Sequence, residues 1–149
     1  MNQRLTQLGE TLLRVFNKFT QNEKKPRHFG VDELLHPSEI HMVMMIGDNE
    51  GAHVSELARI AGVTRGAVSQ VVAKLEKKGL VKKIEDPHNS LKTVPALTNK
   101  GYVAYYAHEQ YHEEMDADMY AYVRGLTDDQ LRVIEDFLRN IEIMADNRQ

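Results

Sequence analysis

The sequence contains no cysteine, which excludes disulfide bonds, thiolate metal sites and thiol-based redox switches. No apolar run approaches the roughly 20 residues that a membrane-spanning helix needs. The first residues also lack the basic-then-apolar layout of a secretory signal, so a cytoplasmic location is expected. Without cysteine, any metal ion has to be held by histidine and carboxylate side chains.

The chain has the length and composition of one globular domain, and its charge is unevenly distributed. Its 149 residues, 42% of them hydrophobic, predict a single domain over residues 1–149. Arg59 to Lys92 hold eight basic and three acidic residues, whereas the rest holds 11 basic and 19 acidic. A basic segment in an acidic protein indicates contact with a polyanion such as nucleic acid, although a solvated charged face gives the same pattern.

The spacing of apolar residues predicts a mainly α fold with about six helices and one two-stranded hairpin. Pro37 marks a first helical position, Thr64 an N-cap, and Thr127 with Gln130 a capping box. A polar loop over 85–90 is expected between the two strands. The helices are expected at about 3–22, 37–47, 54–61, 65–78, 99–124 and 128–144, and the strands at 80–84 and 91–97.

A short helix, a glycine turn, a second helix and a hairpin together indicate a winged helix-turn-helix, here over 36–97. Ala58 lets the two helices approach, Gly62 supplies the positive φ of the turn, and Val68 packs the second helix onto the first. The polar residue types on the outer face suit a DNA major groove, and the hairpin suits the adjacent backbone or minor groove. A winged helix used only for protein contacts is the alternative. The candidate DNA-binding residues are Thr64, Arg65, Gly66, Ser69, Gln70, Lys74, His88, Asn89 and Lys92.

Over nearly its whole length the sequence resembles the MarR family of bacterial transcriptional regulators. The resemblance implies a homodimeric repressor of a near-palindromic double-stranded DNA operator, with 1–30 and 98–149 forming the dimerisation helices. Apolar stripes on the terminal helices agree with this, because a second copy would bury them. The wing departs from the family pattern, since Lys92 is the cation nearest a tip where arginines are usual. The matching stretches are Val54–Ala58, Gly62–Ser69, Leu75–Val81, Leu97–Gly101 and Leu126–Thr127.

His108 and His112 lie four residues apart, so that both imidazoles share one helical face and can reach one metal ion. Both belong to a stripe of residues spaced alternately about four and three positions apart, and this face of the helix is expected to be buried. Two core histidines hydrogen-bonded to carbonyls or tyrosines are the structural alternative. The stripe consists of Gly101, Tyr105, His108, His112, Met115, Met119 and Tyr122.

One branch of the family, the zinc-responsive adhesin-competence-type repressors, resembles this chain at four metal-ligand positions. Those positions carry Glu23, His41, His108 and His112 here, which implies one tetrahedral zinc site per subunit. The second site of that branch does not carry over, because its ligand positions are occupied by Phe29, Ile40 and Ala107.

Three functions follow from these patterns. The first is a repressor whose operator affinity depends on zinc or another divalent transition metal. The second is a MarR-type repressor released by an aromatic or phenolic ligand, with structural histidines and with Tyr105, Tyr106, Tyr111, Met115 and Met119 lining the pocket. The third is a zinc protease, because His108 to His112 spell the HExxH pattern with Glu109 as base. No third ligand follows that motif, so an enzyme is not expected.

Overall fold

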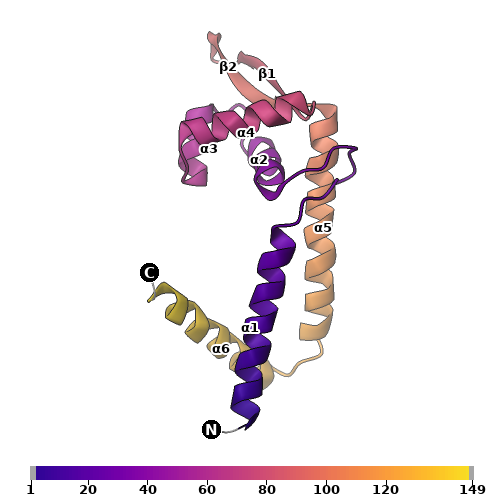
Figure 1. Cartoon of the computed structure of the whole chain (residues 1–149), viewed down its shortest axis with the longest axis vertical. Helices are drawn as coiled ribbons and strands as arrows, with labels where there is room; N and C mark the ends of the chain where they lie inside the picture. The colour runs from indigo at the N-terminus through magenta and orange to yellow at the C-terminus, as the bar shows by residue number, and fades with distance from the viewer. Residues whose placement is uncertain (1–2, 148–149) are drawn as a thin grey trace. The chain divides into compact units, whose positions relative to one another are not determined.

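The computed structural model describes residues 3–147, which form six helices and one two-stranded antiparallel sheet (Figure 1). This is the mainly α winged helix-turn-helix that the sequence predicts, and the fold class is confirmed. No helix within the described residues is long and apolar enough to span a membrane. The elements are α1 (Gln3–Glu23), α2 (Pro37–Asp48), α3 (Val54–Ala61), α4 (Arg65–Lys77), β1 (Val81–Asp86), β2 (Asn89–Leu97), α5 (Asn99–Val123) and α6 (Asp128–Asp146).

The chain divides into two compact units, Met1–Glu109 and Gln110–Gln149. The first unit contains α1 to α4, the hairpin and the beginning of α5. The second contains the rest of α5 and α6. The single domain expected over 1–149 stays a prediction.

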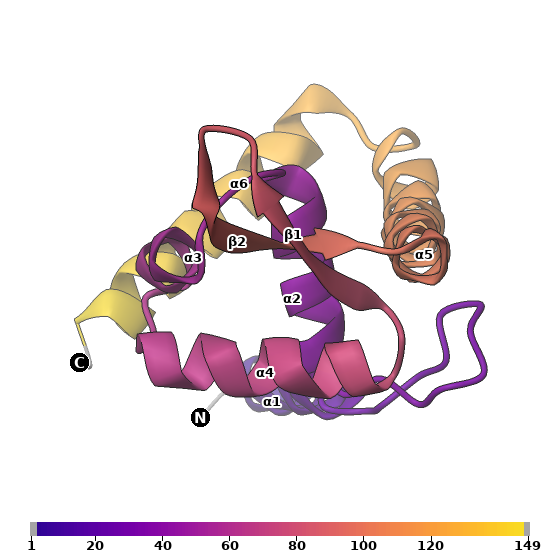
Figure 2. The ribbon, with the colours of Figure 1, turned by 90° about the horizontal axis from the view of Figure 1, so that it is seen from above.

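One apolar core in the first unit joins α2, α3, α4 and the hairpin. Figure 2 shows the β1–β2 hairpin crossing over α2, with α4 along one side and α3 at one end. The periodicity of the helices explains this packing, because each presents one apolar stripe to the same interior. The core includes Leu35, Ile40, Val43, Ile46, Leu57, Val68, Val72, Leu75, Leu80, Val81, Leu97 and Ala104.

The turn between α3 and α4 has the expected geometry. Ala58 is 4% exposed where the two helices approach, and Val68 is fully buried on the facing side of α4. Gly62 ends α3 with a φ of 66°, a left-handed conformation that costs a non-glycine residue free energy. These three residues hold the two helices of the module at one angle.

The wing is longer and its tip is tighter than predicted. The strands extend to Asp86 and begin again at Asn89, so only Pro87 and His88 form the turn. The six-residue polar loop expected over 85–90 was therefore wrong. Asp86 pairs with Asn89 after a register shift next to Glu85, which gives these polar residues ladder partners.

Helix α5 is buried over only part of its predicted stripe. Gly101 and His108 are buried, but His112 is exposed and Met119 is 53% exposed. The prediction that both histidines lie on a buried face was wrong for His112. The physical reason is that the buried part of the helix packs on the winged module, whereas no residue of α6 is buried. The apolar side chains of the second unit lack a core in the single chain.

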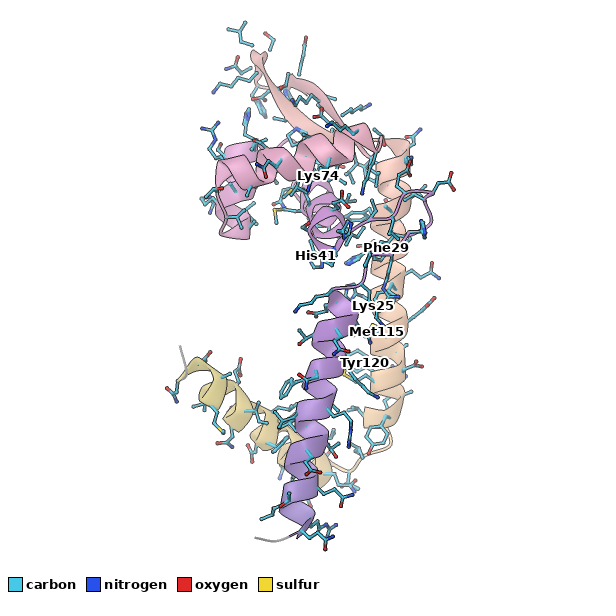
Figure 3. The ribbon with its side chains drawn as sticks, viewed as in Figure 1. Lys25, Phe29, His41, Lys74, Met115 and Tyr120 are labelled. Carbon is cyan, nitrogen blue, oxygen red and sulfur yellow. The ribbon has the colours of Figure 1, made fainter. Side chains whose placement is uncertain are left out.

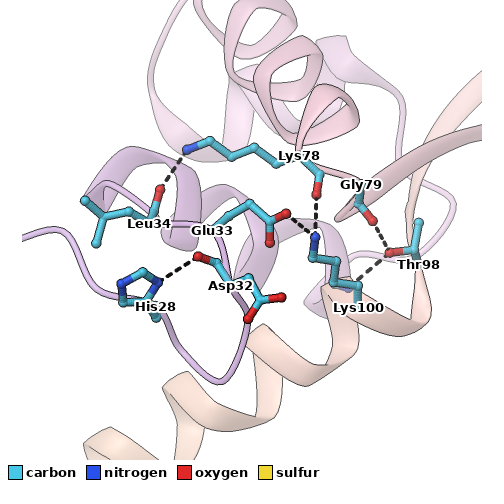
Figure 4. Close-up of polar contacts among 9 residues, drawn as sticks. His28, Asp32, Glu33, Leu34, Lys78, Gly79, Thr98 and Lys100 are labelled. Carbon is cyan, nitrogen blue, oxygen red and sulfur yellow. Dashed lines mark hydrogen bonds and ion pairs between the residues drawn. The ribbon is translucent and has the colours of Figure 1, made fainter.

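The loop between α1 and α2 is tied to the winged module by lysine side chains (Figure 4). Lys78, the C-cap of α4, donates from Nζ to the Leu34 carbonyl at 2.8 Å. Lys100 of α5 hydrogen-bonds the Glu33 carboxylate and donates to the Lys78 carbonyl at 3.0 Å. The loop is thereby fixed to the end of α4 and the start of α5, and it carries Phe29 to a defined place.

Glu39 is a buried carboxylate at the start of α2 that links two elements. Its Oε2 accepts the His36 backbone N–H and Lys78 Nζ, both at 2.8 Å. Burial alone would raise the pKa of Glu39, but these hydrogen bonds outweigh it and lower the pKa below its ordinary 4.5. A lowered carboxyl pKa means that the native state binds this proton less readily than the unfolded chain.

We therefore expect Glu39→Gln to lower the free energy of unfolding at pH 7 by about 1–3 kcal/mol. The stability that the Glu39 carboxylate contributes is fully present above pH 4.5. It is lost as the pH falls through the lower native pKa, because the unfolded chain binds the proton first. Urea unfolding from pH 7 to pH 3 measures this. Glu56→Gln, at an exposed position of α3, is the matched control. A constant difference across this range would contradict the assignment.

Candidate DNA interface and metal centre

The polar face of α4 is presented to solvent while its apolar face is fixed in the core. Thr64 caps the helix, and its side chain accepts the Ala67 N–H at 3.2 Å. Val72 and Leu75 are buried on the opposite side, which sets the rotation of the helix. The six candidate residues of this helix and its cap are all exposed: Thr64, Arg65, Gly66, Ser69, Gln70 and Lys74. Figure 3 labels Lys74 on α4.

A basic hollow extends this surface at the end of α4. It has a volume of about 600 Å³ and lies between the start of α2 and the end of α4. Lys74 was predicted from the sequence, but Lys77 was not singled out. The helical period places Lys77 next to Lys74 on one face, and that signal was available. The lining residues are His36, Ser38, Glu39, Lys74, Lys77 and Lys78.

The wing carries its candidate residues on an exposed tip. His88, Asn89 and Lys92 are all exposed. Leu91 is 94% exposed, and its backbone N–H donates to Asn89 Oδ1 at 3.1 Å. The tip therefore presents an apolar side chain between polar ones, an arrangement that the sequence analysis did not single out.

The wing also contacts α3 through a histidine at the start of that helix. His53 is indeed the N-cap residue of α3, and its Nε2 lies 2.7 Å from Asp86 Oδ2. Thirty-three residues separate the two in sequence. No local pattern identifies such a pair.

His41 and His108 are brought together in the first unit. Their ring centroids are 5.9 Å apart in an edge-to-face arrangement. Phe29 also packs against His108, with ring centroids 5.3 Å apart. His108 is 8% exposed and His41 is exposed, so one ring is buried and the other is open to solvent. Figure 3 labels His41 on α2 and Phe29 on the preceding loop.

The other two predicted ligands are not gathered with this pair. Glu23 is exposed at the last position of α1. His112 follows His108 by one turn of α5 and belongs to the second unit. Within the residues that the structure describes, no three His, Cys, Asp or Glu side chains converge as a metal-binding group.

The separation of the two rings is close to that of two ligands of one zinc ion. Zinc binds an imidazole nitrogen at about 2.0 Å, which places the ion about 3 Å from the centre of the ring. At a tetrahedral angle two such rings have centroids roughly 5 Å apart. The observed 5.9 Å is longer, so the two rings would have to move closer to share one ion.

The phenolic-ligand hypothesis relied on tyrosines of α5, and one of them is engaged within the first unit. Tyr105 donates its hydroxyl to Asp48 Oδ1 at 2.6 Å, and this hydrogen bond raises the pKa of Tyr105. Its ring also lies against Gly47, where a Cβ atom would be 2.6 Å from the tyrosine ring. Tyr105 is thus positioned by the contact between α2 and α5.

Comparison with known proteins agrees with this architecture. Residues 35–90, which include most of the winged module, match the model of the MarR family. The match indicates a MarR-type module over these residues. The uncharacterized HTH-type transcriptional regulator YhjH of Bacillus subtilis (strain 168) is 24% identical over 112 residues, or 75% of this chain. The chain spans 64% of the length of that relative.

Two solved MarR-family structures have a similar fold. The zinc-dependent regulator AdcR in its Zn(II)-bound state gives a TM-score of 0.75 at 21% identity, covering 97% of this chain and 99% of that chain. ZitR of Lactococcus lactis in complex with DNA gives a TM-score of 0.72 at 19% identity, covering 97% and 98%. At these identities the likeness shows the fold alone. The family whose model matches residues 35–90 consists of transcriptional regulators, which argues against the protease interpretation of His108 to His112.

Proposed function

We propose that this chain is a cytoplasmic repressor of the MarR type that binds double-stranded DNA as a homodimer under the control of a metal ion, most simply zinc. The observation that carries DNA binding is the orientation of α4. Its apolar side is held in the core by Val68, Val72 and Leu75, so the side that bears Arg65 and Gln70 must face outward. Arginine and glutamine are residue types that read guanine and adenine edges in the major groove.

A second copy of the chain is the proposed cover for the apolar faces of α1 and α6. No residue of either helix is buried. Phe16 is 48% exposed on α1 and Leu138 is 57% exposed on α6, in amphipathic stripes that a monomer leaves in water. A symmetric dimer buries such stripes and presents two α4 helices. These would read successive major grooves about 34 Å apart, which agrees with a near-palindromic operator.

The contact between His41 and His108 supports metal control. His41 lies on α2 and His108 on α5, so an ion held by both rings would join these two helices. Helix α2 shares the apolar core with α4 through Ile40, Val43 and Ile46. A constraint on α2 therefore acts on the placement of the recognition helix. We include Glu23 and His112 as the remaining ligands, the latter on its helical spacing from His108.

The proposed coupling works in both directions. If metal favours the arrangement that fits the operator, the operator must tighten metal binding by the same factor. The expected change in operator affinity is about 5- to 150-fold, the usual range of such coupling.

The test uses the full chain and a duplex selected by it from random DNA. We expect the wild-type protein to bind this duplex about 5- to 150-fold more tightly, or more weakly, with zinc than with a chelator. His41→Gln and His108→Gln should each remove the zinc effect while leaving the affinity in chelator unchanged. Fluorescence anisotropy of the labelled duplex measures both affinities.

His28→Gln is the matched control, because His28 is an exposed loop histidine whose Nδ1 lies 3.0 Å from the Asp32 carbonyl. It should keep the full zinc response. Because His41 is exposed, its replacement should leave the fold intact even if that of the buried His108 does not. Equal wild-type affinity with zinc and with chelator would refute metal control and leave DNA binding standing. Release by a phenolic compound in both histidine variants would favour the small-ligand alternative.

A further inference from the structure

The hydrogen bond between His53 and Asp86 joins the wing to the helix before the recognition helix. His53 Nε2 and Asp86 Oδ2 are 2.7 Å apart, and the Asp86 side chain is 8% exposed while that of His53 is 36% exposed. The His88 backbone N–H lowers the pKa of Asp86 against the effect of burial, and His53 lowers it further. Asp86 is therefore a carboxylate at neutral pH and can only accept, so His53 must donate from Nε2.

The same carboxylate organises the tip of the wing. Asp86 Oδ1 accepts the His88 backbone N–H at 2.8 Å, while Oδ2 is engaged by His53. Asp86 also stands at the register shift, where it pairs with Asn89. One side chain thus fixes the turn of the hairpin with one oxygen and the attachment to α3 with the other.

The outer part of the hairpin has little else to hold it in place. From Glu85 to Thr93, Asp86 is the single buried residue in the described structure. The apolar residues that anchor the hairpin in the core lie nearer its base, at Val81, Val94 and Leu97. A two-stranded hairpin is marginally stable by itself, so the position of its outer part depends on such contacts.

The His53 side chain contributes nothing visible to its own helix. It is the N-cap residue of α3, but it makes no capping hydrogen bond. Its Nε2 is directed to the wing instead. Removing the imidazole therefore leaves the hydrogen bonds of α3 unchanged and removes the link to Asp86.

We propose that His53 is a positioning residue for the wing, holding the tip where it contacts the DNA backbone and minor groove that flank the major groove read by α4. This inference rests on the proposed DNA binding. His88, Asn89 and Leu91 are exposed on the tip that His53 and Asp86 fix. The link acts through Asp86, and His53 itself need not touch DNA. A pair of residues outside the recognition helix thus has a positioning role in DNA binding.

Hydroxyl-radical footprinting of the selected duplex tests this positioning function. We expect His53→Ala to lose protection in the flanks while keeping it at the centre of each half-site, with affinity about fivefold weaker. His53→Gln retains a side-chain N–H donor and should restore part of the flanking protection. His28→Ala, which removes an exposed loop imidazole, should change neither region.

Hydrogen exchange of the free protein gives a readout that needs no DNA. The backbone amides of residues 88–92 should exchange faster in His53→Ala than in the wild type, and those of α3 should not. Equal exchange, or unchanged flanking protection in a variant that binds the duplex, overturns the inference while the proposed function stands. A wild-type protein that protects no duplex overturns the proposed function and this inference together.

Discussion

Replacing Gly101 with alanine is expected to lower the free energy of unfolding by about 3 kcal/mol, because the new methyl group meets backbone. A Cβ atom at Gly101 would lie 2.2 Å from the Leu80 carbonyl oxygen and 3.2 Å from the Leu97 side chain. The Leu80 oxygen also accepts the Thr98 N–H at 3.0 Å, so it cannot retreat without disturbing the start of α5. The clash outweighs the gain of about 1 kcal/mol that alanine brings to a helix. Urea denaturation of the full chain measures the loss.

Gly9→Ala is the matched control for this substitution. Gly9 lies in α1, and within the described structure a Cβ atom there would have no neighbouring atom within 4 Å. Alanine should leave stability unchanged or raise it by up to about 1 kcal/mol, because it favours the helix. Equal stability of the Gly101 and Gly9 variants would show that α5 and the end of α4 separate easily. That result would contradict the close packing described above.

Replacing Arg65 with alanine is expected to weaken binding to the selected duplex by about 5- to 150-fold, corresponding to about 1–3 kcal/mol. Arg65 is the first residue of α4 and is exposed, at the end of the helix that enters a major groove in this class of module. A lost base contact should also relax the sequence preference at one position of each half-site. Anisotropy titrations with the selected duplex and its single-base variants measure both effects.

Lys74→Ala and Lys25→Ala distinguish contacts with DNA bases from contacts with the charged phosphate backbone. Lys74 lines the basic hollow at the end of α4, where a phosphate contact is expected. Its loss should weaken binding to all sequences alike and reduce the slope of log affinity against log salt by about 0.9 per contact. Lys25, an exposed lysine that donates to Asn22 Oδ1, should change neither quantity. An Arg65→Ala variant that weakens all duplexes alike would assign Arg65 to phosphate rather than to a base.

The helices and their ends were predictable because their signals are local. Pro37 at the first turn, Thr64 at an N-cap, Gly62 in a left-handed turn and the Thr127 capping box all act within a few residues. Thr64, Gly62 and the capping box provide partners for backbone groups at helix ends, and Pro37 lacks an N–H that would have no partner there. The helix-turn-helix could be recognised for the same reason, since its small, glycine and β-branched positions span one short stretch.

The wing and the lower part of α5 were predicted less well because their structure depends on distant contacts. Asp86 appeared to be a loop residue, and only its partners at His53 and His88 make it the end of a strand. The periodicity of α5 predicted one continuous buried stripe, but burial requires a facing surface. The winged module supplies that surface for His108, whereas His112 is exposed in the described structure.

The sequence by itself determined the order of the helices, the polarity of α4 and the concentration of positive charge on the winged module. Helical periodicity and capping depend on residues that are close together in the sequence. Only the tertiary structure decided which distant side chains meet. It placed the ring centroids of His41 and His108 5.9 Å apart, buried Glu39 against Lys78, and joined His53 to Asp86. Such contacts depend on how α2, α4, α5 and the hairpin pack on one core, and spacing along the chain does not encode a distance between separate elements.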